Sequence, residues 1–477
     1  MGIRWKIIDA RSPQPETTSH EAGKAAAPSG RDAAVARLIV CARAFPDLPF
    51  GDDDDSSEDV HAQLPLREAQ LARAIEQAAI RHWLTLVRVL ESRMPNRTWD
   101  RVEPMLQGVL IAGAAQLLLL DRIPAHAAVD HAVEFVKQRG RPKATGFING
   151  VLRSVDRTVL RKDAAPPGND LPARTLMPLG DGRAVTLSDP IFANNTVLRI
   201  AQQTSHPFEL VQRWVGLFGE TATLELCMHN LLQPPILLSG LPASEENESI
   251  VQPHALHSAS IFVGNHSELV ALLERHPTVR VQDPTSALPV QFAAEFLRDR
   301  PPAVIADLCA GRGTKTAQLL ETFPHAEIIA TDVNPARVHD LKQRFAGEER
   351  VLVRPSHEVA QRFANGCDLL LLDVPCSNTG VLARRIEARY RAHDETFESL
   401  CSIQKQILAD SLRLRNPGGV TVYATCSVDP RENQEQMQWL VKWHKLSVVA
   451  EKVTMPHGLP GDPPSIYQDG GYCAIVS

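Results

Sequence analysis

The chain lacks the features of a membrane protein, a disulfide-rich secreted protein or a structural zinc protein. No apolar run in its 477 residues approaches the roughly 20 residues of a membrane span, and the N-terminus has no apolar signal-peptide core. The eight cysteines form no C-x-x-C pair, which argues against a disulfide scaffold and a structural zinc site. Free thiols predict a cytoplasmic location, and we expect no membrane, no metal and a monomer.

The chain also has little positive charge for a protein that would bind nucleic acid. Its formal net charge is −6, so RNA binding would depend on local basic patches. The apolar fraction of 44% and the charged fraction of 22% are typical of globular domains, and the length predicts two or three of them.

The N-terminal third is predicted to be helical. Residues 1–31 are rich in Ala, Ser, Pro and Gly and predict a disordered segment, and the acidic run at 51–59 predicts a solvated loop. Over 32–161 the apolar residues follow helical periodicity without a strand signal, which predicts a helical bundle. The Pro-, Gly- and Asp-rich stretch 162–195 predicts a linker.

The C-terminal part of the chain changes to an alternation of strands and helices. After a helical connecting subdomain at 196–280, apolar strands recur in "AVIADLCA", "AEIIATDV", "DLLLLDV" and "VTVYATCSV". This pattern predicts a multidomain protein whose last part, 281–477, is an α/β doubly wound, Rossmann-like domain with a mostly parallel sheet. Ligands of such sheets bind beyond the carboxyl ends of the strands.

A glycine-bearing turn marks a candidate cofactor site. In "DLCAGRGTKTAQLL", Gly311 and Gly313 allow the backbone to approach a ligand closely. A tight strand-to-helix turn without a ligand would use the same residues, but Asp332 ends the next strand about 20 residues later, where an acidic residue accepts hydrogen bonds from ribose hydroxyls. The combination predicts a nucleoside-containing cofactor and leaves NAD and S-adenosylmethionine open.

Two cysteines favour the second cofactor. Cys376 and Cys426 each follow a predicted strand, so both should open into the crevice of the glycine turn. A buried, inert cysteine is the usual alternative, and it suits five of the other six cysteines better than these two, which lie in polar turns.

The motifs resemble those of RNA cytosine-C5 methyltransferases of the RsmB/Sun (NOL–NOP–Sun) family. The resemblance rests on "DLCAGRGTKT", "LLLLDVPCSNTG" and "YATCSVDPRENQEQ", with "VQDPTSALPVQFAAEFL" before them. The helical block around "LIAGAAQLLLLDRIPAHAAVDHAVEFVKQRG" is similar to the NusB-like RNA-binding domain that precedes the catalytic domain in this family.

The resemblance implies a reaction and a set of residues. It implies S-adenosyl-L-methionine as cofactor, RNA as partner, Cys426 as a nucleophile that adds to C6 of cytosine, and Cys376 as the residue that assists release. Small-subunit rRNA is the favoured substrate, and transfer RNA is the alternative. Asp373 and Lys315 would complete the polar site. The cofactor is expected against Cys309, Ala310, Gly311, Arg312, Gly313, Thr314, Lys315, Asp332 and Asp373. Arg312 and Thr314 replace a proline and a glycine of the usual motif, and Ser356, His357 and Glu358 remain alternatives for the adenine contact.

Basic residues near Cys376 are predicted to contact RNA. The segment "LARRIEARYRAH" carries Arg384, Arg385 and Arg389, which would meet phosphates; a solvated helix face is the alternative reading of these charges. For the whole chain, one alternative function is a non-catalytic NusB-like RNA-binding protein with a degenerate methyltransferase domain. An NAD-dependent oxidoreductase is another, but it leaves the two cysteines without a role.

Overall fold

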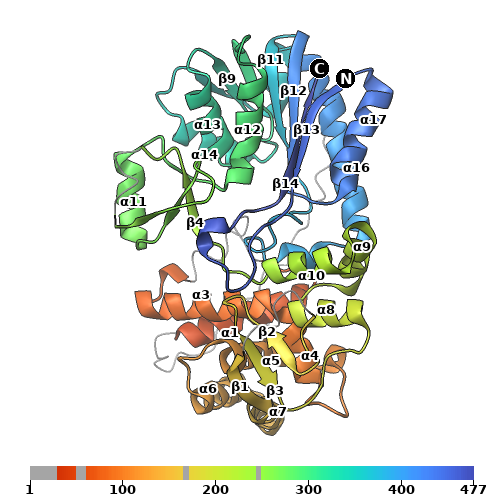
Figure 1. Cartoon of the computed structure of the whole chain (residues 1–477). Helices are drawn as coiled ribbons and strands as arrows, with labels where there is room; N and C mark the ends of the chain where they lie inside the picture. The colour runs from red at the N-terminus through yellow and green to blue at the C-terminus, as the bar shows by residue number, and fades with distance from the viewer. Residues whose placement is uncertain (1–28, 50–60, 165–170, 243–248) are drawn as a thin grey trace.

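The computed structural model describes residues 29–49, 61–164, 171–242 and 249–477. The predicted acidic loop and nearly all of the predicted disordered segment fall outside these ranges. In Figure 1 the helices of the N-terminal bundle lie at the bottom and the α/β domain lies at the top. The bundle consists of α1 (Gly30–Ala44), α3 (Leu66–Arg81), α4 (Trp83–Glu91), α5 (Pro104–Leu119), α6 (Ala125–Gln138) and α7 (Thr145–Thr158).

Local sequence explains how this bundle forms. A capping box starts α1, because the Ser29 side chain accepts from the Asp32 amide and the Asp32 carboxylate accepts from the Ser29 amide. The helix therefore begins at Gly30, inside the segment predicted to be disordered. Helix α5 is apolar on all sides and nearly all of its residues are buried, as expected of the central helix of a bundle. No helix in the described ranges is long and apolar enough to cross a membrane.

The prediction of a linker at 162–195 is wrong in part, because residues of this stretch contribute to a small antiparallel sheet. The strands are β1 (Val159–Ala164), β2 (Leu176–Pro178) and β3 (Ala184–Leu187), in the order β1-β3-β2. Met177 and Val185 are fully buried in the core of the N-terminal bundle. The Asp–Gly residues that suggested a linker form the turn of a β-hairpin, where Gly182 has a φ of 83°.

The middle of the chain is a helical unit followed by a small mixed unit. The helices are α8 (Thr196–Thr204), α9 (Phe208–Phe218) and α10 (Glu220–His229), and in Figure 1 they lie between the bundle and the α/β domain. The mixed unit packs α11 (His266–Arg275) against β4 (Ile236–Ser239), β5 (Val251–Pro253), β6 (Ser260–Phe262) and β7 (Arg280–Val281).

The C-terminal domain confirms the predicted doubly wound fold. Its strands are β8 (Val304–Asp307), β9 (Glu327–Ala330), β10 (Val351–Val353), β11 (Cys367–Asp373), β12 (Arg415–Thr425), β13 (Val448–Thr454) and β14 (Gly471–Val476). Its helices are α12 (Pro284–Phe296), α13 (Thr314–Thr322), α14 (Pro335–Arg344), α15 (Ser356–Arg362), α16 (Asp394–Ser411) and α17 (Gln434–His444). Helices α12 to α14 pack on one face of the sheet, and α16 and α17 pack on the other (Figure 1).

The strand order determines where a ligand can bind. Within the described ranges the order is β10-β9-β8-β11-β12-β14-β13, with parallel pairing from β10 to β12 and antiparallel pairing at β14. The chain leaves β8 toward one edge and returns to β11 on the other side, so the order reverses between β8 and β11. That reversal is the topological switch point at which doubly wound sheets bind ligands.

Candidate active site

The turn after β8 has two glycines with different structural tasks. Gly311 has a φ of 55°, and a Cβ atom built on it would meet no atom within 4 Å, so the turn is open on that side. Gly313 has a φ of 79°, and a Cβ there would come within 2.8 Å of Leu341 and Phe345. Gly313 therefore lets the start of α13 pack closely against Leu341 and Phe345, while Gly311 leaves room for a ligand.

Asp332 lies just after the neighbouring strand β9 and is hydrogen-bonded to this turn. One carboxylate oxygen accepts from the Gly311 amide at 3.0 Å, and the other accepts from the Asn334 amide at 2.9 Å. Arg337 lies 3.7 Å away as an ion-pair partner. Asp332 thus fixes the shape of the turn, in the position expected of a ribose acceptor.

Asp307, which the sequence did not single out as a site residue, is the least satisfied carboxylate of the site. Its Oδ2 accepts from the Thr316 hydroxyl at 2.7 Å, whereas its Oδ1 is buried and has no hydrogen-bond partner within the described residues. Burial, and then the charges of Asp373 and Asp332, raise the pKa of Asp307 to about 7, against the opposing hydrogen bond from Thr316. A polar ligand atom that reached Oδ1 would remove this deficit.

Lys315 and Asp373 form an ion pair between the turn and the end of β11. Lys315 Nζ lies 2.6 Å from Asp373 Oδ2 and donates to the Ser286 hydroxyl at 3.2 Å. Burial opposes the ammonium charge, but the carboxylate of Asp373, and then Cys426 and Asp307, raise the pKa of Lys315. Lys315 therefore remains a cation in a site surrounded by negative charge.

The two predicted cysteines come into direct contact. Strands β11 and β12 are parallel neighbours, with Asp373 opposite Ala424, so the residues that follow them meet at one edge of the sheet. Cys376 Sγ and Cys426 Sγ are 3.1 Å apart, and both thiols are free. Cys426 Sγ also lies 3.1 Å from Asn378 Oδ1. Asn378 has a φ of 61°, a left-handed conformation that asparagine tolerates better than most residues.

The surroundings of Cys376 favour the protonated form of its thiol. The hydrogen bond with Cys426 is the largest cause that raises the pKa of Cys376 well above its usual range, followed by burial and by the charges of Cys426 and Glu432. The Cys376 thiol is therefore held in its protonated form, in contact with the sulfur of Cys426.

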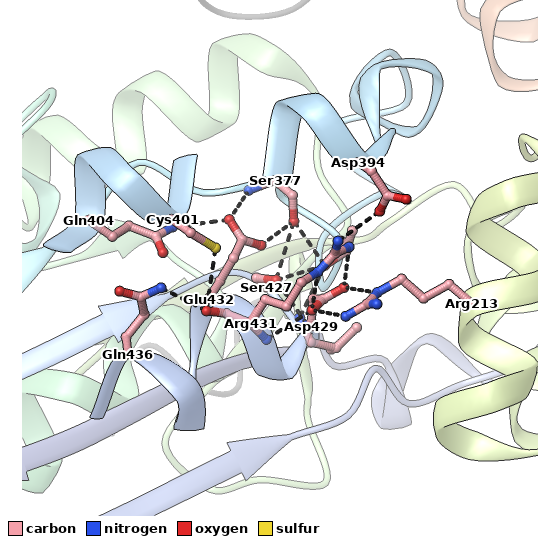
Figure 2. A network of polar contacts seen from close by, with 12 residues as sticks. Arg213, Ser377, Asp394, Cys401, Gln404, Ser427, Asp429, Arg431, Glu432 and Gln436 are labelled. Carbon is pink, nitrogen blue, oxygen red and sulfur yellow. Dashed lines mark hydrogen bonds and ion pairs between the residues drawn. The ribbon is translucent and has the colours of Figure 1, made fainter. Parts of the chain in front are cut away.

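A buried polar network holds the two cysteine turns (Figure 2). Glu432 and Asp429 are both fully buried. Glu432 accepts from the amide and hydroxyl of Ser377, and Asp429 accepts two hydrogen bonds from the Arg213 guanidinium at 2.7 and 2.9 Å. Arg213 belongs to α9, so the connecting helices reach the two cysteine turns. Neither carboxylate was singled out from the sequence, although both lie within the quoted "YATCSVDPRENQEQ" motif.

The prediction that Arg389 contacts RNA is wrong. Arg389 is completely buried, and its guanidinium donates to the carbonyls of Arg81, Thr204, Asn230 and Leu382. Its neighbours along the chain, Ile386 and Tyr390, belong to the core of the N-terminal bundle. At Arg389 the segment after Cys376 is therefore a junction between the domains.

Arg384 and Arg385, two other arginines of that segment, lie closer to the surface. Arg384 is 31% exposed, but it is paired with Asp469 at 2.6 Å and with Asp283 at 3.5 Å, and it lies over the ring of Tyr467. These contacts hold the segment against the start of α12. Arg385 is partly exposed, and its RNA contact stays a prediction. The three alternatives for the adenine contact, Ser356, His357 and Glu358, all lie in the first turn of α15.

Comparison with known proteins places this geometry in a family. A model of the 16S rRNA methyltransferase RsmB/F family matches residues 294–460, and a model of the NusB family matches residues 48–157. The chain is 29% identical over 378 residues to ribosomal RNA small subunit methyltransferase B of Xanthomonas campestris, covering 77% of this chain and 75% of that protein. It is 26% identical over 361 residues to the probable ribosomal RNA small subunit methyltransferase B of Bacillus subtilis, covering 72% and 74%.

The C-terminal domain of the chain matches the RsmB/F methyltransferase family, and its N-terminal bundle matches the NusB family. The crystal structure of PH0851 has the same fold, with a TM-score of 0.65 and 19% identity over 93% of this chain and 98% of that one. The predicted family, the NusB-like domain and the Rossmann-like methyltransferase domain are thus confirmed.

The cofactor of this methyltransferase domain is S-adenosyl-L-methionine, and the residues of the glycine turn fit it. The open side of Gly311 leaves space, and Asp307 Oδ1 needs a partner. The carboxylates of Asp307, Asp373 and Asp332 act together with burial to raise the pKa of the Cys309 thiol, which shows that their negative charge converges there. Such a site stabilises a sulfonium cation. When bound, the cofactor supplies an electrophilic methyl group.

We expect Asp332→Ala to weaken S-adenosylmethionine binding without weakening RNA binding. The change removes an acceptor for ribose hydroxyls and frees the Gly311 amide, and losing such a charged hydrogen bond costs about 1.5–3 kcal/mol, or roughly 10- to 150-fold in affinity. Isothermal titration calorimetry measures the effect. Asp340→Ala, an exposed change on α14, is the control. Unchanged affinity in Asp332→Ala would remove this residue from the cofactor site.

Proposed function

We propose that this RNA methyltransferase methylates C5 of cytosine through a covalent bond between Cys426 Sγ and C6 of the base. The observation that carries the proposal is the contact between the sulfurs of Cys376 and Cys426, 3.1 Å apart, at the switch point of the sheet. The partly buried Lys315–Asp373 pair lies beside them. A second cysteine in contact with the first has no purpose in a simple methyl transfer, but it has one when a sulfur must first add to the base and later leave.

The chemistry explains why cytosine needs a nucleophile. C5 of cytosine is a weak nucleophile, and addition of a thiolate to C6 saturates the C5–C6 double bond and leaves an enamine across C4 and C5, whose C5 can attack the methyl group. After transfer, C5 carries both the methyl group and a proton. A base takes that proton, the electron pair re-forms the C5–C6 double bond, and Cys426 leaves as a thiolate. Lys315 and Asp373 supply a donor and an acceptor for the polar edge of the base.

In this proposal, the protonation of Cys376 depends on whether Cys426 is bound to the base. In the free protein the hydrogen bond to Cys426 is the main cause of the raised pKa of Cys376. Once Cys426 is bound to C6 as a thioether, its sulfur is a weaker hydrogen-bond acceptor, and the pKa of Cys376 falls. Cys376 can then release its proton to solvent and, as a thiolate, take the proton from C5, at the stage at which that proton must be removed.

We propose small-subunit rRNA as the substrate, because the matched relatives are named for methylation of that RNA. Bisulfite sequencing of total RNA with and without the gene tests this proposal directly. We expect one or a few cytosines of the small-subunit rRNA to lose their protection when the gene is absent. An unchanged pattern in every RNA, together with absence of methyl transfer to purified rRNA, would contradict cytosine-C5 methylation. A non-catalytic RNA-binding protein would give that same result.

We expect the exposed basic residues at the end of α6 to contribute to RNA binding. Lys137, Arg139, Arg141 and Lys143 are all exposed, and two of them pair only with exposed carboxylates: Lys137 with Glu134 and Arg141 with Glu103. These surface ion pairs are weak and can be exchanged for phosphates.

The charge reversals Arg139→Glu and Lys143→Glu together should weaken RNA binding several-fold and reduce its dependence on salt, because fewer counterions are released. Filter binding at several salt concentrations measures both effects. Arg67→Glu, an exposed change on α3, is the matched control. An equal loss in the control would mean that the end of α6 has no special role.

A further inference from the structure

The turns that carry Cys376 and Cys426 belong to different strands, so something must hold them at a fixed distance. Three direct contacts do so through backbone groups and hydroxyls. The Gly380 amide donates to the Cys426 carbonyl at 2.9 Å, the Thr379 and Ser427 hydroxyls are 2.9 Å apart, and the Val428 amide donates to the Thr379 hydroxyl at 3.2 Å. All three lie on the far side of Cys376 from β11. Ser377, next to Cys376, meets the Cys426 turn through a longer contact of 3.3 Å between its hydroxyl and that of Ser427, and shorter hydrogen bonds to its amide and hydroxyl come from another group.

That group is the carboxylate of Glu432. Its Oε2 accepts from the Ser377 hydroxyl at 2.5 Å, and its Oε1 accepts from the Ser377 amide at 2.9 Å and from the Gln404 side chain at 3.0 Å. Figure 2 shows the three donors converging on one buried carboxylate. Gln404 lies on α16 and also donates to the Pro375 carbonyl at 3.0 Å, so the residues on both sides of Cys376 are tied to the same small group of side chains.

Glu432 itself is anchored to the strand of Cys426. It ends the short 3-10 turn Pro430–Glu432 that follows the Cys426 turn. Its carbonyl accepts from the Tyr423 hydroxyl at 2.6 Å, and Tyr423 is a buried residue of β12. Its carboxylate is fully buried. A buried carboxylate is stable only when its oxygens accept hydrogen bonds, and both oxygens of Glu432 do so. Glu432 thus connects the end of β12 with the turn after β11.

We propose that Glu432 is a positioning residue that holds Ser377, and with it the sulfur of Cys376, at the distance from Cys426 that release of the methylated base requires. The inference rests on the proposed function, because it assigns Cys376 to release and Cys426 to addition. Glu432 does not touch the reacting atoms. Addition of Cys426 to C6 does not depend on the Ser377 turn, whereas release does, so loss of this contact slows release more than addition.

Two substitutions separate the geometry of Glu432 from its charge. Glu432→Asp keeps the charge but shortens the side chain by one methylene group, so the carboxylate cannot reach the Ser377 amide and Gln404 together. Glu432→Gln keeps the reach, because its amide oxygen can accept from the Ser377 amide and from Gln404, and its amide nitrogen can donate to the Ser377 hydroxyl. A positioning role therefore predicts that Glu432→Asp is the more damaging change.

The experiment follows turnover and the covalent complex together in the full-length protein with rRNA substrate. We expect Glu432→Asp to lower turnover roughly 100-fold, the effect of a displacement of about 1 Å, and to accumulate a protein–RNA band on a denaturing gel. Glu432→Gln should stay within about 10-fold of the wild-type turnover without that band. Glu435→Asp, an exposed change on the next turn of the chain, is the matched control and should behave as the wild type.

The outcomes distinguish failure of this inference from failure of the proposed function. Wild-type turnover in Glu432→Asp, a covalent band of equal strength in Glu432→Gln, or a parallel loss of turnover and adduct formation in both variants would overturn the positioning role. Should Glu432→Asp not fold, as judged by lost S-adenosylmethionine binding, Ser377→Ala takes its place, and its wild-type turnover would overturn the role. RNA containing 5-fluorocytosine, which cannot lose a C5 proton, should trap the wild-type protein. Absence of that complex would instead overturn the covalent reaction itself.

Discussion

Replacing Cys426 with alanine is expected to abolish methyl transfer and to leave no covalent protein–RNA complex, while Cys376→Ala should form the complex and fail to resolve it. Removal of a covalent nucleophile costs roughly 10⁴-fold or more in turnover. Both variants are therefore almost inactive, but for opposite reasons. A denaturing gel separates them, because a stalled adduct migrates as a slow band that contains both protein and RNA.

The structure gives a physical reason for the different behaviour of the two variants. Cys426 contacts Cys376 and donates a hydrogen bond to Asn378 Oδ1, and the cationic Lys315 lies close enough to interact with Cys426. A nearby cation favours a nucleophilic thiolate during addition. Lys315 remains when the Cys376 thiol is removed, so addition continues. The proton on C5 then has no acceptor at the position of Cys376, and elimination stops.

A third cysteine provides the control for this comparison. Cys401 lies on α16, and its thiol donates to the Arg431 carbonyl at 3.4 Å, without contact to either catalytic sulfur within the described residues. Cys401→Ala should retain turnover close to that of the wild type. Adduct formation by Cys426→Ala, or its absence in Cys376→Ala with normal S-adenosylmethionine binding, would reverse the assignment of the two cysteines.

The sequence was sufficient to predict the parts of the site that depend on strand ends. Asp332, Asp373, Cys376 and Cys426 each follow an apolar strand, and a doubly wound sheet brings such residues to one edge whatever the rest of the fold does. Their convergence could therefore be predicted from the fold class alone. Asp307 could have been found by the same rule, since it is the last residue of β8.

The remaining features depend on contacts between distant segments and could not be predicted from the local sequence. Arg389 looks like a surface arginine in its own sequence context, and only the packing of the bundle and α8 to α10 around it makes it buried. Glu432 looks like an ordinary charged residue of a helix start. The apolar residues of β2 and β3 are too few to stand out, and they form strands because the bundle core covers them.

The largest effect on stability is expected for Arg389. Its guanidinium donates to carbonyls from the N-terminal bundle, from α8 and the end of α10, and from the segment after Cys376, so it joins three parts of the chain. Tyr390 reinforces this junction, because its hydroxyl donates to the Ile80 carbonyl at 2.5 Å and lies 2.9 Å from the Ser205 hydroxyl.

We expect Arg389→Ala to lower the free energy of unfolding by about 3–5 kcal/mol, because buried carbonyls lose their donors and a cavity replaces a large side chain. Urea denaturation followed by tryptophan fluorescence measures the loss. Arg391→Ala is the matched control: Arg391 is 41% exposed and pairs with Glu387 at 3.7 Å, so its removal should change stability by no more than about 0.5 kcal/mol. If instead Arg389→Ala were as stable as Arg391→Ala and bound RNA more weakly, the side chain would have to leave the junction to reach phosphates. The original prediction of an RNA contact would then be correct.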